Sequence, residues 1–418
     1  MSETLASKRP TDWATIVAAG MLCSLPLVAI QGPAHTTPMD GVNFLFVIGY
    51  WIYILTRRET LKFPLILPFW IICLGSCTGL FSAIDRPRAF LVIAEDLYLY
   101  TWFVTLSHFL TRRCRVDRVV VTWVLVAVGI AMCTVLDMKL GLFGGRFAGT
   151  DALRATGTFE NPNMFGDYLV LSMFLSWSVA AGGRKIFYLA VPAIFLGVLA
   201  TASNGAMASV VGGSMVMAAM DPRWWQPRRL GALLLVAGVA IGAVCIVVYS
   251  GTDLATELAN RKRGEIGGAA GKGMEERVPV WLDAWYDVQH NPFGVGPGNF
   301  NRDGGPVSHD DHAAHNEYVG MTVERGPLGL IGFCSILITL LLGLQRLARS
   351  PAAETCGLGV LQLYGALGGM VAHALVIELS HFRHTWLGFA VLWSIVAQMT
   401  SRASAQDQGG LVPMREAA

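Results

Sequence analysis

The sequence predicts an all-helical protein that crosses a membrane many times. Of its 418 residues, 54% are hydrophobic and only 14% are charged, whereas about 25% of the residues in a soluble domain are charged. The mean hydropathy is +0.51. The apolar residues fall into about twelve segments near the roughly 20 residues that cross a bilayer as a helix. An ordinary soluble protein is excluded, and the 31 basic and 29 acidic residues give no net charge that favours nucleic acid.

Twelve segments are predicted to span the membrane, in order along the chain. They cover 13–30, 42–56, 64–84, 89–110, 119–138, 163–181, 186–201, 204–220, 230–250, 327–345, 357–379 and 385–401. The first ends in a polar run at 31–41 without a small-residue cleavage site, so we interpret it as a membrane helix and not as a signal peptide. The seventh and eighth are the least distinct, because only Ala202-Ser203-Asn204 separates them.

The basic residues predict the orientation of these spans. With the N-terminus in the cytoplasm, 18 of the 31 Lys and Arg fall on the cytoplasmic side, and the short exterior loops hold only Arg86, Arg88 and Arg383. Cytoplasmic loops carry such an excess of basic residues, so both termini are predicted to be cytoplasmic. The chain then divides into a cytoplasmic tail (1–12), nine spans with an exterior loop at 139–162 (13–250), a large exterior loop (251–326), three spans (327–401) and a second cytoplasmic tail (402–418).

The segment 251–326 is predicted to be an ordered exterior subdomain. A structureless loop of this length is uncommon unless it is functional. The segment holds four of the nine histidines, a run of Gly/Pro turns at 291–298 and a short predicted helix around Glu275–Gln289. The alternative is that its basic residues only keep a long loop solvated, since long loops are exempt from the charge rule.

Three exterior motifs carry the polar chemistry. The first, Arg154-Ala-Thr-Gly-Thr-Phe-Glu-Asn-Pro-Asn163, contains Glu160, Asn161 and Asn163 just before the sixth span. Its asparagines are also typical of a plain helix start with Asn163 as the cap, although this leaves Arg154 without a role. The second motif is Arg277-Val-Pro-Val-Trp281, followed after one helix by the glycine-rich run 290–300. That run is a simple turn, or it lets backbone amides approach an anion.

The third motif is His309-Asp-Asp-His-Ala-Ala-His-Asn-Glu-Tyr318, which leads through Gly326-Pro-Leu-Gly329 into the tenth span. Imidazole and carboxylate groups suit zinc or manganese, but the spacing matches no zincin motif. The alternative is that His315 is a general base, because its ring titrates near neutral pH. The eight cysteines show no paired metal-ligand spacing, and no G-x-x-x-x-G-K-[ST] loop occurs. We therefore expect neither a metal nor another cofactor.

These residues resemble a known family. His315-Asn316, nine residues, and then Gly326-x-x-Gly329 is similar to the signature of O-antigen ligases. The Arg154 motif and Gly294-Val-Gly-Pro-Gly-x-Phe300 resemble the wider group that also contains O-antigen polymerases and bacterial O-oligosaccharyltransferases. One departure is Thr201-Ala-Ser-Asn-Gly-Ala206, where relatives often carry an arginine after the serine. No cation role is therefore expected at this position.

The resemblance implies a membrane glycosyltransferase of GT-C-like architecture. It implies transfer of O-antigen polysaccharide from undecaprenyl diphosphate to the lipid A core oligosaccharide, at the periplasmic face of a bacterial inner membrane. The expected partners are these two substrates and membrane lipids. Arginine binds phosphate oxygens in a bidentate manner and can stabilise a departing diphosphate in place of a metal. The implied site residues are the base His315 with Asn316, the diphosphate ligands Arg154, Arg277, Arg146 and Arg263, and the positioning residues Glu160, Asn161, Asn163, Gly326 and Gly329.

Three other functions are kept as alternatives. Within the family, these are a protein O-oligosaccharyltransferase and an O-antigen polymerase; from another class, it is a flippase for lipid-linked sugars. A transporter is expected to concentrate its charges at mid-membrane on broken helices, whereas here they concentrate at one face. The few ionisable residues within spans, Glu95, Asp96, His373 and Glu378, are expected to contact substrate or to form ion pairs, for instance with Arg88 or Arg383.

Overall fold

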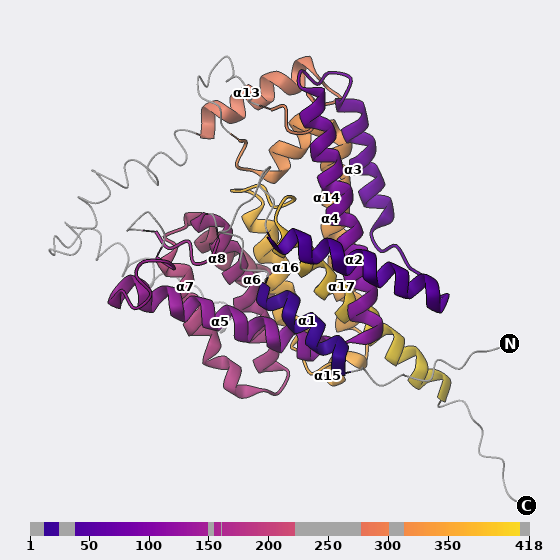
Figure 1. Ribbon diagram of the computed structural model, residues 1–418, viewed down its shortest axis with the longest axis vertical. Helices are drawn as coiled ribbons and strands as arrows, with labels where there is room; N and C mark the ends of the chain where they lie inside the picture. Colours follow the sequence, from indigo (N-terminus) through magenta and orange to yellow (C-terminus); the bar gives the residue numbers. More distant parts are fainter. Residues whose placement is uncertain are drawn as a thin grey trace, which may run out of the picture.

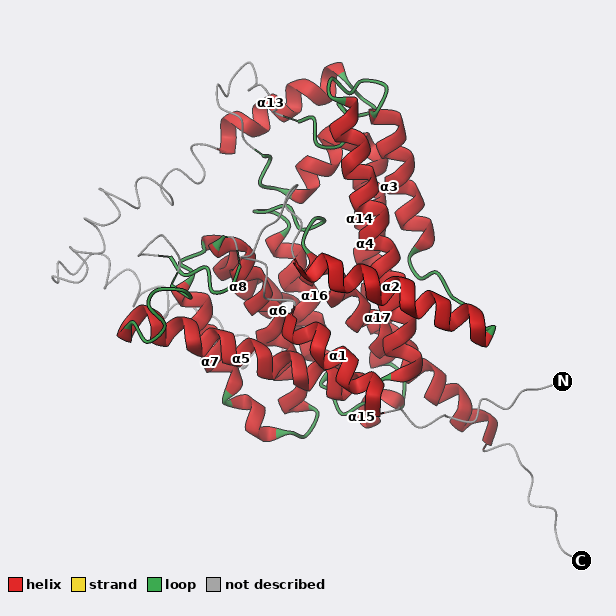
Figure 2. Cartoon of the chain, viewed as in Figure 1, coloured by secondary structure: helices red, strands yellow, loops and turns green. Residues whose placement is uncertain are grey.

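The computed structural model describes residues 12–24, 38–148, 154–159, 161–221, 277–300 and 313–409, and over these ranges it contains helices and no strand (Figures 1 and 2). In order, the helices are α1 (Asp12–Ser24), α2 (Pro38–Arg57), α3 (Ile66–Gly79), α4 (Arg86–Arg113), α5 (Val116–Leu140), α6 (Pro162–Ala181), the 3-10 helix η2 (Lys185–Tyr188), α7 (Ala190–Ala200), α8 (Asn204–Met220), α13 (Arg277–His290), α14 (Glu317–Ala348), α15 (Ala352–Thr355), α16 (Val360–His373) and α17 (Arg383–Gly409).

Five of these helices, α2, α4, α5, α6 and α14, are long and apolar enough to cross a membrane. The chain is therefore a polytopic membrane protein with an all-helical fold, as predicted. Eleven of the twelve predicted spans overlap a described helix, and 230–250 lies outside the described residues. Several limits differ from the prediction: α14 begins at Glu317 and not at 327, α16 ends at His373 and not at 379, α3 ends at Gly79 and not at 84, and α17 ends at Gly409 and not at 401. The helix expected around Glu275–Gln289 is α13.

Loops that the charge pattern assigns to one side of the membrane contact one another. At the predicted cytoplasmic end, Arg113 pairs with Glu59, and Arg184 pairs with Asp117 at 2.8 Å. At the other end, the first residue of α17, Arg383, binds Asp40 of α2 through Nε and Nη2 at 2.5 and 2.6 Å. We call this second end the exterior end; it includes the described residues of 80–85, 141–161, 201–203, 277–316 and 374–382. Which end faces the cytoplasm stays a prediction.

α6 and α16 lie in the centre of the bundle, and almost all of their side chains are buried. Small residues allow α8 to approach α16 closely: a Cβ atom added at Gly213 would lie 2.5 Å from the carbonyl oxygen of Gly365, and one at Gly212 would lie 2.5 Å from the Ala372 Cβ. Such contacts are typical of helix packing in membranes, where van der Waals contact replaces the hydrophobic effect. The core therefore brings α6, α8 and α16 together next to the exterior end.

α14 is broken at Gly326, whose φ of 63° and ψ of −168° are not helical. Pro327 has no N–H group, so the carbonyl of Val323 loses its helical donor. The glycine-rich run supplies the replacements: Val295 N donates to Val323 O at 2.9 Å, and Gly296 N donates to Glu324 O at 3.0 Å. The second motif therefore folds onto the break in the third.

α3 also packs against this break. A Cβ atom at Gly75 would lie 2.5 Å from the carbonyl oxygen of Arg325, and one at Gly79 would lie 2.6 Å from that of Glu324. Gly329 is equally constrained, because a Cβ atom there would lie 2.6 Å from Met321 O. Gly326 and Gly329 thus have a packing role, in which the backbone approaches too closely for any side chain.

Candidate active site

His315 lies on a short segment between α13 and α14, with both of its neighbours fixed. Trp281 of α13 donates from Nε1 to the carbonyl oxygen of Ala314 at 3.0 Å. Asn316 caps α14, because its Oδ1 accepts from the N–H groups of Tyr318 and Val319 at 3.0 and 3.2 Å. His315 itself has a φ of +46° and an exposed side chain. The structure therefore presents the imidazole at the exterior end on an anchored backbone.

The first residue of α14, Glu317, binds this segment to the connection between α16 and α17. Its N–H donates to Ala374 O at 2.8 Å. Its buried carboxylate accepts from Leu379 N at 2.5 Å and from Ser380 N at 3.0 Å. A buried carboxylate is tolerated when backbone N–H groups satisfy it. The turn that follows His315 is thus held by a satisfied charge.

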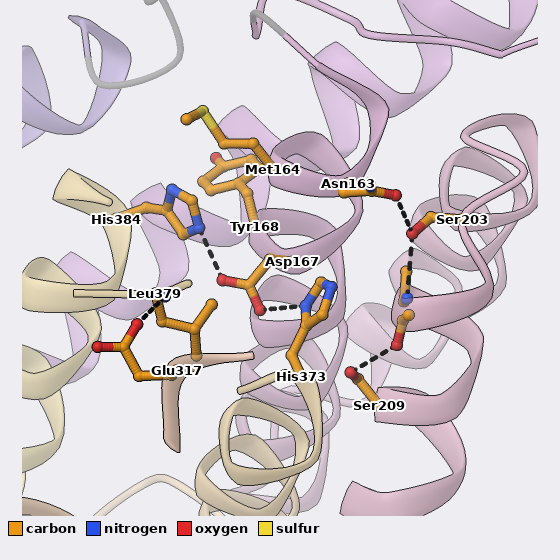
Figure 3. Close-up of polar contacts among 12 residues, drawn as sticks. Asn163, Met164, Asp167, Tyr168, Ser203, Ser209, Glu317, His373, Leu379 and His384 are labelled. Carbon is orange, nitrogen blue, oxygen red and sulfur yellow. Dashed lines mark hydrogen bonds and ion pairs between the residues drawn. The ribbon is translucent and has the colours of Figure 1, made fainter. Parts of the chain in front are cut away.

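A second buried carboxylate lies next to this connection (Figure 3). Asp167 of α6 binds His373 Nδ1 of α16 at 2.5 Å through Oδ1, and His384 Nε2 of α17 at 2.8 Å through Oδ2. All three side chains are buried. When Asp167 is ionised, both ring nitrogens must carry hydrogen, because a carboxylate only accepts. Since Ala374 directly follows His373, this cluster fixes the backbone carbonyl that receives Glu317.

Of these three residues, only His373 was predicted from the sequence, and Asp167 and His384 were not. A usable signal was present, because ionisable residues inside apolar spans are costly and usually have a partner or a function. What the sequence does not give is their pairing: Asp167 is separated from its two partners by 206 and 217 residues.

Arg154 is held between the first turn of α6 and the C-terminal end of α7. Its Nη2 donates to Asn163 Oδ1 at 2.9 Å, and its Nε donates to the carbonyl oxygen of Thr201 at 3.3 Å. Ser203, the N-cap of α8, donates to the same Asn163 oxygen at 2.7 Å (Figure 3). The guanidinium therefore lies beside the N-termini of α6 and α8, which favour an anion, while its Nε binds the C-terminal carbonyl group of α7.

The expected cap of α6 needs a correction. Asn161 is the N-cap, accepting from Met164 N at 2.8 Å, whereas Asn163 lies inside the first turn and contacts Arg154. Pro162 explains the difference, because proline is favoured at the first helical position and so makes the preceding residue the cap.

The remaining predicted residues lie apart from this network or outside the described ranges. Arg277 begins α13 and is half-buried, and burial lowers the pKa of its guanidinium. Arg146 is exposed on a turn that wraps around the Asp137 carboxylate. The residues outside the described ranges are Glu160, Arg263, His309, Asp310, Asp311 and His312. Among the residues that the structure describes, no cluster of three or more His, Cys, Asp or Glu could hold a metal.

A buried ion pair stands at the break in α14. Arg325 Nη2 binds Asp96 Oδ2 of α4 at 2.8 Å, and its Nε donates to Ser76 Oγ of α3 at 3.1 Å. Asp96 therefore forms an ion pair, one of the two expected outcomes, but its partner is Arg325 and not Arg88 or Arg383, the two examples that were named. The neighbouring Glu95 lies 3.7 Å from His381. Burial lowers the pKa of His381, but the nearby negative charge of Glu95 outweighs it and raises this pKa to about 10.

Replacing Asp167 with asparagine is expected to destabilise the protein. The amide keeps the shape but removes the negative charge that two buried imidazoles share, and breaking a buried pair costs about 3–5 kcal/mol. The thermal midpoint of the detergent-purified protein should fall by several degrees. Asp117→Asn is the matched control, because its arginine partners are partly exposed and such pairs contribute only about 0–1 kcal/mol. Equal midpoints for the two variants would show that the Asp167 cluster has no structural role.

Comparison with known proteins agrees with the motif analysis. The family model described as O-Antigen ligase matches residues 189–334, which is about a third of the chain. The match includes α7, α8, α13 and the whole run from His315 to Gly329, and it leaves out Arg146 and Arg154. A search of curated proteins finds no match. Residues 189–334 therefore match the O-antigen ligase family, as the resemblance of the motifs within this range predicted.

Proposed function

We propose that this protein transfers O-antigen polysaccharide from undecaprenyl diphosphate to the lipid A core oligosaccharide, at the periplasmic face of the inner membrane. The match to the O-antigen ligase family supports a glycan ligase or polymerase. The more specific proposal depends on the position of His315. Its side chain is exposed at the exterior end, while Trp281 and Asn316 hold the backbone on either side. This arrangement suits a general base for a large acceptor that approaches from outside the bundle.

In the proposed reaction, His315 takes the proton of the acceptor hydroxyl. The hydroxyl oxygen attacks the anomeric carbon of the donor sugar, and the bond from that carbon to the diphosphate oxygen breaks. The bonding electrons leave with the diphosphate, which stays attached to undecaprenol. The proton on His315 then passes to solvent, which restores the base.

The leaving diphosphate gains negative charge, and arginines are proposed to stabilise it. Arg154 fits this role because it lies beside the N-terminal ends of α6 and α8. Arg277 fits because burial disfavours its charged form, so an anionic ligand would compensate for lost hydration. Arg146 and Arg263 are further candidates. Several guanidinium groups can replace a divalent ion in this role.

Lipopolysaccharide from a deletion strain tests the proposed function. Loss of polymer from the lipid A core, with polymer retained on the carrier, is expected for a ligase. Loss of the polymer itself would indicate a polymerase. Normal lipopolysaccharide together with unglycosylated exported proteins would indicate an O-oligosaccharyltransferase, and carrier-linked sugar confined to the cytoplasmic leaflet would indicate a flippase.

Replacing His315 with alanine should abolish transfer while the protein still folds and binds donor. A general base contributes about 10²–10⁴-fold in rate, so activity with purified donor and acceptor should fall at least about 100-fold. His290→Ala is the control, because His290 is also an exposed exterior histidine, at the end of α13. If His315→Ala kept near wild-type activity, the base would have to be sought at His309 or His312.

Lysine in place of Arg154 or Arg277 should impair transfer clearly. Lysine keeps the charge but loses the planar, bidentate fork, and one lost charge-assisted hydrogen bond corresponds to roughly a tenfold or greater decrease in rate. Arg346→Lys, near the other end of α14, should have no effect. Full activity of both exterior lysine variants would support the alternative that these arginines only solvate their loops.

Chelation should leave the reaction unchanged. If arginines carry the charge of the leaving group, purified protein should turn over equally with and without EDTA, and added Mg²⁺, Mn²⁺ or Zn²⁺ should not stimulate it. In the same assay, His312→Ala should be far milder than His315→Ala. Inactivation by EDTA that one divalent ion reverses would overturn the metal-independent mechanism and make His309, Asp310 and His312 candidate ligands.

A further inference from the structure

α13 exposes apolar side chains and buries an acidic one, which is the reverse of a helix surrounded by water. Its exposed face carries Val278, Leu282, Trp285 and Tyr286, with exposed fractions between 45% and 62%. These positions are spaced i, i+4, i+7 and i+8, so they form one stripe along the helix. Asp283, by contrast, is only 1% exposed. A helix surrounded by water would expose its acids and bury its aromatic residues.

The opposite face of α13 is already occupied by protein. Val280 and Ala284 pack in a small cluster with Phe300, Ala314 and Val323, apart from the main core. The apolar stripe is therefore not the face that attaches α13 to the rest of the molecule. It needs an apolar partner of its own.

The segment that follows α13 contacts the end of α3, whose exposed side chains are apolar. On α3, Leu67, Trp70 and Leu74 are exposed at helical spacing, as expected for a row that faces lipid, and the exposed Phe81 follows the helix. Phe293, which follows α13, is exposed as well, and its carbonyl oxygen lies 3.5 Å from the Thr78 hydroxyl near the end of α3. The apolar surface of the spanning helices thus leads onto α13.

The level of α13 also fits the edge of the membrane. The part of α14 that follows the break at Gly326 ends at Ala348 and so is about 33 Å long, close to the hydrocarbon core, which is about 30 Å thick. The predicted span 327–345 accounts for that thickness, which leaves the turns before Gly326 at or above the surface. α13 packs on Val323 in those turns, and Figure 1 shows it beside the upper end of α14.

We propose that α13 lies in the outer-leaflet interface of the membrane, with the stripe of Val278, Leu282, Trp285 and Tyr286 inserted among the lipids. The occupant of the stripe is the bilayer itself, because the stripe extends a surface that already faces lipid. Tryptophan and tyrosine are enriched at this depth, where their rings contact acyl chains and their polar atoms reach water. Amphipathic helices bind in this way with the apolar face buried about 5–10 Å.

The position of α13 has a consequence for the site, and this step rests on the proposed function. Trp281 of α13 donates to Ala314, which precedes His315. A helix seated in the interface therefore holds the imidazole at a fixed height above the lipid headgroups. The donor's diphosphate is attached to a lipid and lies at the same height.

Quenching of tryptophan fluorescence by brominated lipids tests the location of α13 without reference to activity. In proteoliposomes, the emission lost in Trp285→Phe should be quenched strongly by lipids brominated near the glycerol end of the acyl chain, and less by lipids brominated near the methyl end. Trp281→Phe is the matched control on the same helix, and the emission that it removes should be quenched less by either lipid. If aqueous iodide quenches Trp285 and the bromolipids do not, or if neither does, the stripe contacts water or protein and the proposal is wrong.

A second measurement tests the consequence for transfer. Trp285→Glu should reduce transfer roughly tenfold or more, whereas Trp285→Phe should keep near wild-type activity. Trp285→Glu should also abolish quenching by bromolipids in this region, which is measured on a tryptophan introduced as Tyr286→Trp in the same chain. Positive quenching with no transfer by the wild-type protein would disprove the proposed function and leave the membrane contact standing. Unchanged transfer by Trp285→Glu would disprove the link between α13 and His315.

Discussion

The exterior half of this protein depends on the break in α14 at Gly326 and Pro327. Proline removes one helical donor, and the positive φ of Gly326 turns the chain, so the carbonyl groups of Val323 and Glu324 need new partners. The N–H groups of Val295 and Gly296 provide them. The break in α14 thereby becomes the attachment point for the segment that begins with α13. In the same region α3 packs so closely that only glycine fits at Gly75 and Gly79.

Buried charges complete this attachment, and each is satisfied. Arg325 binds Asp96 and Ser76 across three helices, Glu317 accepts two backbone N–H groups, and Asp167 binds two imidazoles. Buried ions contribute little net stability, but removing one partner is costly, so such pairs permit few alternative arrangements. The contacts of Arg325 consequently fix the start of α14 against α3 and α4. The contacts of Glu317 and the Asp167 cluster fix it on the side of α6 and α16.

Hydropathy was sufficient to predict the helical class and most of the spans, because an apolar run of about 20 residues is the length that crosses a bilayer as a helix. It failed at the start of α14, where Glu317 and Arg325 look polar in sequence although both are buried beside their partners. The pairing of Arg325 with Asp96 joins residues 229 apart, which periodicity does not report. The motif at His315 was found because its residues are contiguous. The Asp167 cluster was missed because its three members come from three distant helices.

A physical reason connects the cations of the proposed site with α13. The proposed donor carries its diphosphate at the depth of the lipid headgroups, where the surroundings change from hydrocarbon to water. A guanidinium at this depth is only partly hydrated, so it interacts with an anion more strongly than it would in bulk water. Arg277 meets this condition if α13 lies in the interface, because it begins that helix and adds its charge to the positive end of the helix dipole. Arginines farther from the membrane would have to reach down to the same phosphates, which makes Arg277 the cation best matched in height to the proposed substrate.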